Sequence, residues 1–359
     1  MLNVSHNLSL EKYFLGINAD KHSDVSNFKA FVSYSLGIIK SIKPPKLKVI
    51  ASESRMSVLN ISEFINDDLD LLDSESILDE EIKKLDNLSD AILDSFVILK
   101  ENNRKTNTRN VYCSSQKRGV KGLEYLVLIS VKGNNTKVIG IKRLISKPNL
   151  ITESINLIDK ILKYKSINSV KADNHFFHDI LINYLNSKNI TFISKPKKSG
   201  IWSKIALKNC FNHIDLTGFR YHNGIYTRDL ILNHKLYGIC KIVKVKPSYR
   251  AEEKKCFYIV STNINLSVMD IVKGKKQRWK IETVFRDCSQ NLGLRSCQCT
   301  NDKTIDNHVL MSFLTYNFLS EIKKIFNHKN KTIGYIKRTI QASIYATTNV
   351  FDLIEQKIP

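Results

Sequence analysis

The chain has 359 residues, enough for two or three domains, and it combines an ordinary globular content of 42% hydrophobic residues with a formal net charge of +22. Residues 1–94 hold 10 Lys/Arg and 16 Asp/Glu, so the whole positive excess lies in residues 95–359. This distribution favours a nucleic-acid partner for the last three quarters of the chain, although a general abundance of Lys, Ile and Asn also raises net charge without any function.

The sequence carries no signal for export or for a membrane span. Its longest apolar run, Tyr125–Val131, has the length of a strand, and the N-terminus lacks a basic start followed by an apolar stretch. The seven cysteines are odd in number and show no paired spacing, which supports neither a disulfide framework nor a zinc site. We therefore expect a reduced, cytoplasmic protein with no membrane partner.

Residues 1–87 are expected to form a small helical domain. Apolar residues recur at close to a helical period over Val25–Lys43, and the Pro-Pro pair that follows ends this helix. A second helical stretch runs from about Ser54 to Phe64. It is followed by an acidic segment, residues 67–81, which we expect to be a solvated joint that does not touch DNA.

Residues 88–197 change character and predict an α/β fold. Three apolar, β-branched runs precede an alternation of helix and strand, and a Gly-Asn-Asn turn joins the second run to the third as a hairpin. The expected strands are Ala91–Leu99, Tyr125–Lys132, Thr136–Ile145, Ser169–Ala172 and Ile190–Ser194, and the expected helices are Thr152–Lys163 and Phe176–Asn189. Three strands followed by helix, strand, helix and strand is the order of a ribonuclease-H-like catalytic core.

Residues 198–262 interrupt this rhythm and predict a β-rich insertion without a good helix. Its expected strands are Ile225–Leu232, Leu236–Val245 and Cys256–Val260. Residues 263–359 are then expected to form the second part of the core and the C-terminal helices. Within them, one long helix covers Met269–Leu294 and a helical block covers Asp306–Leu319.

Three carboxylates stand out by their positions in these elements. Asp94 lies inside an apolar strand, Asp173 lies at the C-terminal end of another strand, and Glu282 lies on the long helix. A carboxylate in an apolar strand is costly unless it is paired or binds a metal, and ligands collect at strand ends in open α/β sheets. Magnesium prefers oxygen ligands, so these residues could together hold two Mg²⁺ ions. The alternatives are a helix cap for Asp173, a strand-end role for Asp94, and Asp90 in place of Asp94.

A polar stripe surrounds Glu282 on the long helix. At 100° per residue, its members fall within a sector of about 80°. They are Lys275, Arg278, Glu282, Arg286 and Ser289. The stripe is either a site for phosphate and metal or a solvated face held by ion pairs between Glu282 and the two arginines. Trp279 points away from the stripe and is expected to pack in the core, and His175 is either a DNA-contacting residue or a loop residue without a role.

Specific segments of the last third resemble one family. They are YIVSTNINLS (residues 258–267), QRWKIETVFRD (277–287) and NLGL (291–294). They resemble DDE transposases of bacterial insertion sequences, in the group with a β-rich insertion and a Tyr-x2-Arg-x3-Glu-x6-Lys signature. Asp173, with its Val-Lys-Ala lead and the Phe-Phe pair after it, is similar to the second aspartate motif, and Asp94 is more weakly similar to the first.

This resemblance implies cleavage at transposon ends and strand transfer into target DNA, with Asp94, Asp173 and Glu282 as catalytic metal ligands. It implies two Mg²⁺ ions, replaceable by Mn²⁺, and double-stranded DNA as partner, both as terminal inverted repeats and as target. It also implies a homodimer on DNA, association with the bacterial nucleoid, and a DNA-end-binding role for the N-terminal helices.

The stripe would then contact DNA through Lys275, Arg278, Arg286 and Ser289. Lys275 stands where the signature has tyrosine and Ser289 where it has lysine. The serine replaces a charge-assisted contact with a neutral hydrogen bond and puts DNA affinity in doubt. Two alternatives therefore remain, an inactive DNA-binding remnant and a ribonuclease-H-like nuclease without strand transfer.

Overall fold

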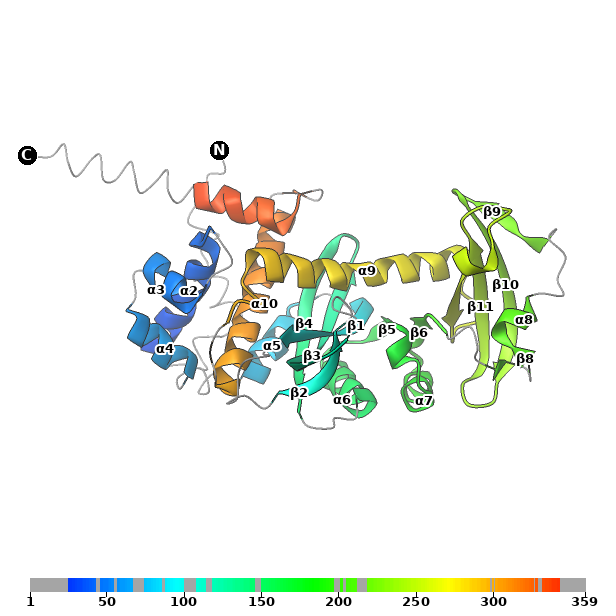
Figure 1. The fold of residues 1–359 in the computed structure, drawn as a ribbon, viewed down its shortest axis with the longest axis horizontal. Helices are drawn as coiled ribbons and strands as arrows, with labels where there is room; N and C mark the ends of the chain where they lie inside the picture. The colour runs from blue at the N-terminus through cyan, green and yellow to red at the C-terminus, as the bar shows by residue number, and fades with distance from the viewer. Residues whose placement is uncertain are drawn as a thin grey trace, which may run out of the picture.

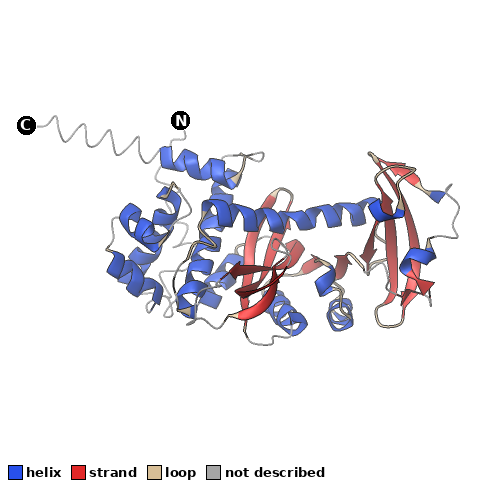
Figure 2. Cartoon of the chain, viewed as in Figure 1, coloured by secondary structure: helices blue, strands red, loops and turns tan. Residues whose placement is uncertain are grey.

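The computed structural model shows a mixed α/β chain built on one large sheet with helices on both faces (Figure 1; Figure 2). The ranges that it describes are 25–42, 46–54, 57–66, 74–85, 88–99, 108–113, 118–145, 150–196, 201–202, 205–211, 218–297, 299, 301–325, 327–328 and 331–342. No helix in these ranges has both the length and the apolar character that crossing a membrane requires.

The helices that precede the sheet are α2 (Val25–Lys40), α3 (Leu47–Ser54), α4 (Val58–Asn66) and α5 (Ser74–Lys83). The first confirms the predicted helix, and α4 corresponds to most of the stretch predicted from about Ser54 to Phe64, whereas α3 was not predicted. Residues 67–73 of the expected acidic joint lie outside the described ranges.

The expectation of a solvated joint was wrong for α5. Its Glu81 is fully buried, and Lys137 and Asn317 both reach its carboxylate, at 3.5 Å and 3.4 Å. A buried carboxylate needs such partners, and the acidic composition alone did not reveal them. The helix therefore joins the N-terminal region to the sheet.

The sheet is assembled around β1 (Leu88–Leu99). This strand pairs antiparallel with β3 (Arg118–Lys132) and parallel with β5 (Ile167–Lys171), and β5 pairs parallel with β6 (Thr191–Ser194). On the other side of β3 lie β4 (Asn135–Leu144), which forms the predicted hairpin, and β2 (Arg109–Cys113), which the sequence did not predict.

The β-rich segment extends this same sheet beyond β6. The described strands and helix here are β7 (Ile201–Trp202), β8 (Ile205–Ala206), α8 (Leu207–Cys210), β9 (Arg220–His222), β10 (Ile225–His234), β11 (Gly238–Lys246) and β12 (Phe257–Ser261). Because β12 pairs antiparallel with β6, the order β6-β12-β11-β10-β9 is continuous with the core. The short helix α8 was not expected. We call β9–β12 the sheet extension.

Two helical layers cover the sheet. On one face lie α6 (Leu150–Leu162) and α7 (Asp179–Ser187), which follows a 3-10 turn, Asn174–Phe176. On the other lie α9 (Val268–Asn291) and α10 (Asp302–Ile325), and a final helix covers residues 333–342. Figure 1 shows that α9 runs from the sheet extension across the core toward the N-terminal helices.

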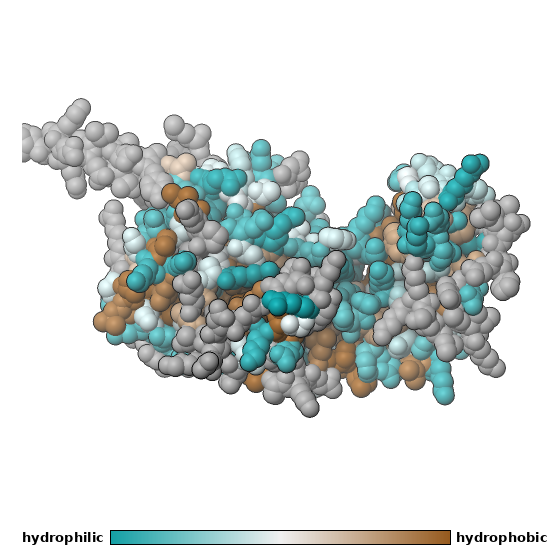
Figure 3. All heavy atoms as spheres, in the orientation of Figure 1, coloured by the Kyte–Doolittle hydropathy of each residue, from teal (hydrophilic) through white to brown (hydrophobic). Residues whose placement is uncertain are grey.

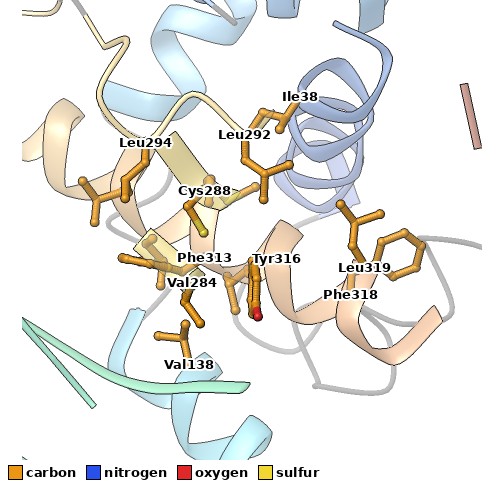
Figure 4. Close-up of a cluster of buried hydrophobic side chains, with 14 of the residues drawn as sticks. Ile38, Val138, Val284, Cys288, Leu292, Leu294, Phe313, Tyr316, Phe318 and Leu319 are labelled. Atoms are coloured by element: carbon orange, nitrogen blue, oxygen red, sulfur yellow. The ribbon is translucent and has the colours of Figure 1, made fainter. Parts of the chain in front are cut away.

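The largest apolar core lies under the C-terminal half of α9. There Val284 and Cys288 of α9 contact the buried side chains of α10, with Val138 of β4 and Ile38 of α2 in the same cluster (Figure 4). This packing joins four elements that are far apart in the sequence. It fixes the axial position of α9, and so it fixes where Glu282 lies relative to the strands.

Candidate active site

Asp94, within β1, lies level with Asp173, which follows the end of the adjacent parallel strand β5. In the pairing of β1 with β5, Asp90 is opposite Ser169 and Ile92 is opposite Lys171. The same offset continued by one strand repeat places Asp94 opposite Asp173. The alternation of β1 turns Asp90, Ile92 and Asp94 toward the α9 face, since Ile92 packs in the core under α9.

Helix α9 brings Glu282 to the same place. Ser267 caps the helix by accepting a hydrogen bond from the Asp270 amide, and Gly274 lets the helix approach the strands closely. A Cβ at Gly274 would lie 2.7 Å from Ile193 Cδ1 and 3.3 Å from Lys171 Cε. Farther along, Phe285 packs against Phe96 of β1 with ring centroids 5.1 Å apart and the ring planes tilted by 45°. The helix is therefore held against β1, β5 and β6 on both sides of Glu282.

Arg278 bridges two of the three predicted carboxylates. Its Nη1 donates to Asp94 Oδ2 at 3.0 Å and its Nη2 donates to Glu282 Oε1 at 2.5 Å. The predicted ion pair between Arg278 and Glu282 is thus present, and it extends to a strand that the sequence could not link to the helix. One guanidinium serves two carboxylates, so the negative charge here exceeds the positive charge that is directly bonded to it.

This excess charge affects the protonation of Asp94. Burial raises the pKa of Asp94 to about 6, and the negative charges of Asp173 and Glu282 add to the increase. The Ser95 amide and Arg278 act in the opposite direction without cancelling it. The effect of both partner carboxylates on one group indicates that the three acids form one electrostatic cluster.

Asp90, the alternative to Asp94, has a different set of partners. Its Oδ1 accepts hydrogen bonds from the Ser169 hydroxyl at 2.6 Å and from the Lys171 ammonium at 2.8 Å. Lys171 is 4% exposed in its side chain and also donates to Gln277 of α9. The Asp90 charge is therefore neutralised within the sheet, which favours Asp94 as the carboxylate of the site.

Lys171 is a residue whose importance the sequence analysis missed. Its ammonium ties β1, β5 and α9 together through Asp90 and Gln277, and burial lowers the pKa of this lysine. The available signal was a cation inside a short apolar strand, two residues before Asp173. Such a residue needs a buried acidic partner, which only the neighbouring strand could supply.

A cavity of about 240 Å³ opens beside Asp173. It is lined by Ala172, Asp173, Asn174, Ile193, Ser194, Lys195, Lys275, Arg278 and Trp279. Burial lowers the pKa of Lys275, and the positive charges of Lys195 and Arg278 lower it further. Lys275 also lies over the Phe257 ring, with Nζ 3.8 Å from the centroid. Three cations close to one carboxylate form a site suited to an anion such as a phosphate.

The expected core role of Trp279 was wrong. Its side chain is 60% exposed, and it lines the cavity next to Arg278, whose guanidinium carbon lies 5.9 Å from the indole ring. The core role was predicted only from the angular position of Trp279 on the helix, which points away from the polar stripe. This flank of the helix borders the cavity instead of the core.

His175 and Asp173 share a turn at the end of β5. Asp173 caps the turn by accepting a hydrogen bond from the His175 amide at 2.8 Å, so the predicted capping role is present. The hydroxyl of Ser194 donates to the Asp173 carbonyl at 2.9 Å. The His175 side chain is exposed. Capping uses one carboxylate oxygen of Asp173 and leaves the other for a ligand.

The remaining stripe residues lie farther along α9. Arg286 is exposed. Ser289 differs, because its hydroxyl is buried and has no hydrogen-bond partner in the part of the chain that the structure describes. A hydroxyl in that position cannot reach a phosphate unless its surroundings move. Of the four predicted DNA-binding residues, Ser289 therefore has the least support from the geometry.

The carboxylates suit a divalent cation by their chemistry. Asp94, Asp173 and Glu282 offer only oxygen donors, which Mg²⁺ prefers, and a cation would relieve the repulsion that acts on Asp94. Among the residues that the structure describes, no three His, Cys, Asp or Glu side chains are already grouped as a complete metal-binding set. Arg278 lies where a cation between Asp94 and Glu282 would otherwise bind. Metal binding at this point requires the guanidinium to move aside.

Two comparisons with known proteins found matches. Residues 90–318 match the family described as Transposase DDE domain, and this range includes Asp94, Asp173 and Glu282. No curated protein sequence matches the chain. Among solved structures, a piggyBac transposase synaptic complex with hairpin DNA is similar at a TM-score of 0.57 and 12% identity, over 93% of this chain and 73% of that one. At this identity, the likeness supports the fold alone.

The family match therefore identifies the class of the protein, a transposase. Because the family match covers more than half of the chain, the chain belongs to the DDE-domain transposase family. The finer description as a bacterial insertion-sequence enzyme rests on the sequence resemblance.

Proposed function

We propose that the protein cleaves DNA at transposon ends and joins the freed 3′ ends to target DNA. The observation that carries the proposal is the meeting of Asp94 and Asp173, level on adjacent parallel strands, with Glu282 and Arg278 of α9. The fold supports it, because the order β4-β3-β1-β5-β6 with β5 and β6 parallel to β1 is the arrangement of a ribonuclease-H-like core. The sheet extension then corresponds to the predicted insertion of residues 198–262.

In this proposal, Asp94, Asp173 and Glu282 hold two Mg²⁺ ions, for which Mn²⁺ substitutes. Bound divalent cations supply charge stabilisation to a phosphodiester in line with an attacking oxygen. The protein itself positions the carboxylates, and the burial of Asp94 reduces the screening of the carboxylate charges by water. Arg278 is ion-paired with Asp94 and Glu282, and it would be available to a phosphate if divalent cations took its place between them.

The cationic cavity next to Asp173 is the proposed place for the DNA backbone. Lys195, Lys275 and Arg278 supply the positive charge, and Lys275 preserves a cationic contact at the signature position of tyrosine. Arg286 extends the contact along the exposed side of α9. The face seen in Figure 3 is largely hydrophilic and is hollowed between the core and the sheet extension, as a groove for DNA requires.

The substrate in this proposal is double-stranded DNA, first as terminal inverted repeats and then as target. The N-terminal helices bind the ends, and two copies of the chain hold two ends together, as the family resemblance implies. Such a protein works in the cytoplasm at the nucleoid. Binding should weaken steeply with salt, because phosphate contacts release counterions.

A magnesium-dependent assay on an end-containing duplex tests the proposal. We expect nicking at the end and capture of the 3′ end into a second duplex, with both activities lost in Glu282→Gln and Asp173→Asn. Nicking that is equal in wild type and both variants would show a contaminant and contradict the proposal. Nicking without 3′-end transfer would leave a ribonuclease-H-like nuclease in its place.

Two observations favour a second candidate, a DNA-binding protein that does not cleave. Arg278 holds Asp94 and Glu282, and the lysine of the family signature is replaced by Ser289 with a buried hydroxyl. If this candidate were correct, the chain would bind end-containing duplex with strong salt dependence and give no nicking in Mg²⁺ or Mn²⁺. Isothermal titration with Mg²⁺ alone would then show no binding that depends on Glu282.

A further inference from the structure

The sheet extension brings three tyrosines together on one surface. Tyr226 of β10 is directly opposite Tyr221 of β9, and Tyr249 lies in the turn after β11. The ring centroids of Tyr221 and Tyr226 are 5.2 Å apart, and those of Tyr226 and Tyr249 are 5.5 Å apart. The interplanar angles are 55° and 62°, so the Tyr226 ring contacts the other two rings in a tilted, edge-on arrangement. We call these three residues the tyrosine cluster.

The cluster is not part of an apolar core. Tyr221 is 63% exposed and Tyr249 is 42% exposed, whereas Tyr226 between them is half-buried. An aromatic side chain normally contributes to stability through burial, which Tyr221 largely lacks and Tyr249 has only in part. Their arrangement therefore leaves ring surface available to another molecule.

The cluster lies on the face of the sheet that is turned away from α9. Tyr226 shares its strand face with Leu230, which packs toward Trp202, whereas α9 packs on the opposite face against Val243 and Val245. The tyrosine cluster is consequently separated by the sheet from Lys275 and the cavity at Asp173. The tyrosine cluster is therefore a surface distinct from the candidate active site.

Cations are interleaved with these rings. Lys246 is directly opposite Tyr226 on β11, and its ammonium lies 4.7 Å from the centroid of the Phe219 ring. Arg250, next in sequence to Tyr249, is exposed, whereas Arg220 is paired with Thr227 and therefore lies on the opposite face of the sheet. Residues 220–255 contain nine Lys/Arg and three Asp/Glu. Two of these acids are ion-paired, Glu252 with Lys254 and Glu253 with Lys244. The surface is therefore complementary to a polyanion that carries aromatic groups.

We propose that the tyrosine cluster binds unpaired DNA, with bases stacked on Tyr221 and Tyr249 and phosphates near Arg250. Exposed aromatic rings interleaved with cations on a β-sheet suit single strands, because every base has a face for stacking whereas duplex bases already stack on each other. The inference rests on the proposed DNA function and adds a second DNA form to it. A strand freed by cleavage would supply such unpaired bases.

Fluorescence anisotropy with a labelled single strand of about twelve nucleotides tests the proposal. We expect Tyr221→Ala and Tyr249→Ala each to weaken binding about ten-fold, and Tyr221→Phe and Tyr249→Phe to retain it, because the stacking surface remains. The same strand with abasic positions keeps the phosphates but lacks the bases. It should bind wild type and the alanine variants equally.

Tyr335→Ala is the matched control. Tyr335 is 38% exposed and carries a lysine ammonium 4.8 Å from its ring centroid, but it lies on the final helix, outside the sheet extension. Its removal should not change single-strand affinity. Equal affinity of wild type and the Tyr221→Ala/Tyr249→Ala double variant for the base-containing strand would overturn the proposal and leave the cluster as a surface for another kind of partner.

The two proposals fail separately. If wild type nicks duplex DNA but the double variant binds base-containing and abasic strands as wild type does, the tyrosine proposal is lost and the enzymatic one is kept. If wild type never nicks DNA but binds unpaired strands through the tyrosines, the reverse holds. Thermal melting of each variant establishes that it is folded, and the Phe variants provide the comparison if an Ala variant is not.

Discussion

Asp90 and Asp94 lie on the same face of β1, yet their surroundings differ. Asp90 receives a lysine ammonium and a serine hydroxyl from β5. Asp94 shares one arginine with Glu282; burial raises the pKa of Asp94 to about 6, and the negative charges of Asp173 and Glu282 add to the increase. The charge of Asp90 is neutralised by a structural ion pair. Around Asp94, by contrast, the carboxylates outnumber the cations bonded to them, which we call the acid surplus. A buried carboxylate alone therefore does not mark a functional site, whereas a surplus of like charge at a strand end does.

The most direct test of the difference between Asp90 and Asp94 is to remove each carboxylate in turn. We expect Asp94→Asn to lower the magnesium-dependent nicking rate by about a thousand-fold or more, since it removes charge at the reacting centre. Asp90→Asn should lower it by about ten-fold, because it disturbs only the support of the site. Single-turnover rates on an end-containing duplex measure both effects. Equal losses in the two variants would refute the distinction.

Stability in the absence of metal gives a second test. Because the folded-state pKa of Asp94 is raised from 3.8 to about 6, the native state binds the proton more tightly than the unfolded state. The stabilising contribution of the protonated form is complete below pH 4 and is lost as the pH rises through 6. Asp94→Asn should therefore be more stable than wild type at pH 7.5 in EDTA, by up to about 3 kcal/mol.

Urea unfolding at pH 7.5 and at pH 4 measures this difference, which should disappear at the lower pH. Asp90→Asn is the matched control. It leaves the Lys171 ammonium buried without its carboxylate, so it should be destabilised at both pH values. A wild type more stable than Asp94→Asn at pH 7.5 in EDTA would contradict the acid surplus.

Substitution of Lys171, the partner of Asp90, tests how far this buried ion pair supports the active site. Lys171→Met should cost about 10- to 100-fold in nicking, because the tie from β5 to Asp90 and Gln277 holds α9 in place. The half-saturating Mg²⁺ concentration should rise as well, which a purely structural loss of folded protein would not cause. Lys171→Arg should recover part of both effects. In combination with Asp90→Asn, the Lys171→Met loss should not add, because the two residues form one pair.

The smallest expected effect concerns the exposed flank of α9. Arg286→Ala should weaken duplex binding by a few-fold and reduce the slope of log affinity against log salt by about one. Arg338 is likewise exposed but lies on the final helix, and Arg338→Ala should leave the slope unchanged. Binding titrations at several salt concentrations provide the comparison. An unchanged slope for Arg286→Ala would remove this residue from the proposed DNA surface.

Local patterns were sufficient for much of the core. The apolar run of β1, the Gly-Asn-Asn hairpin between β3 and β4, and the periodicity of α6 and α9 each predicted an element that the structure contains. These signals depend on short-range properties, namely turn geometry and the repeat of apolar residues. The strand β2 was not predicted, since its pairing with β3 and not its own sequence defines it.

Local sequence patterns did not predict the contacts between the residues of the candidate site. The sequence by itself determined that Asp94 sits in an apolar strand, Asp173 at a strand end, and Glu282 one helical turn after Arg278. Only the tertiary structure decided that Arg278 reaches Asp94, that Lys171 neutralises Asp90, and that Trp279 borders a cavity. The physical reason is that charge and burial depend on neighbours distant in the chain, and the packing of α9 across the sheet selects those neighbours.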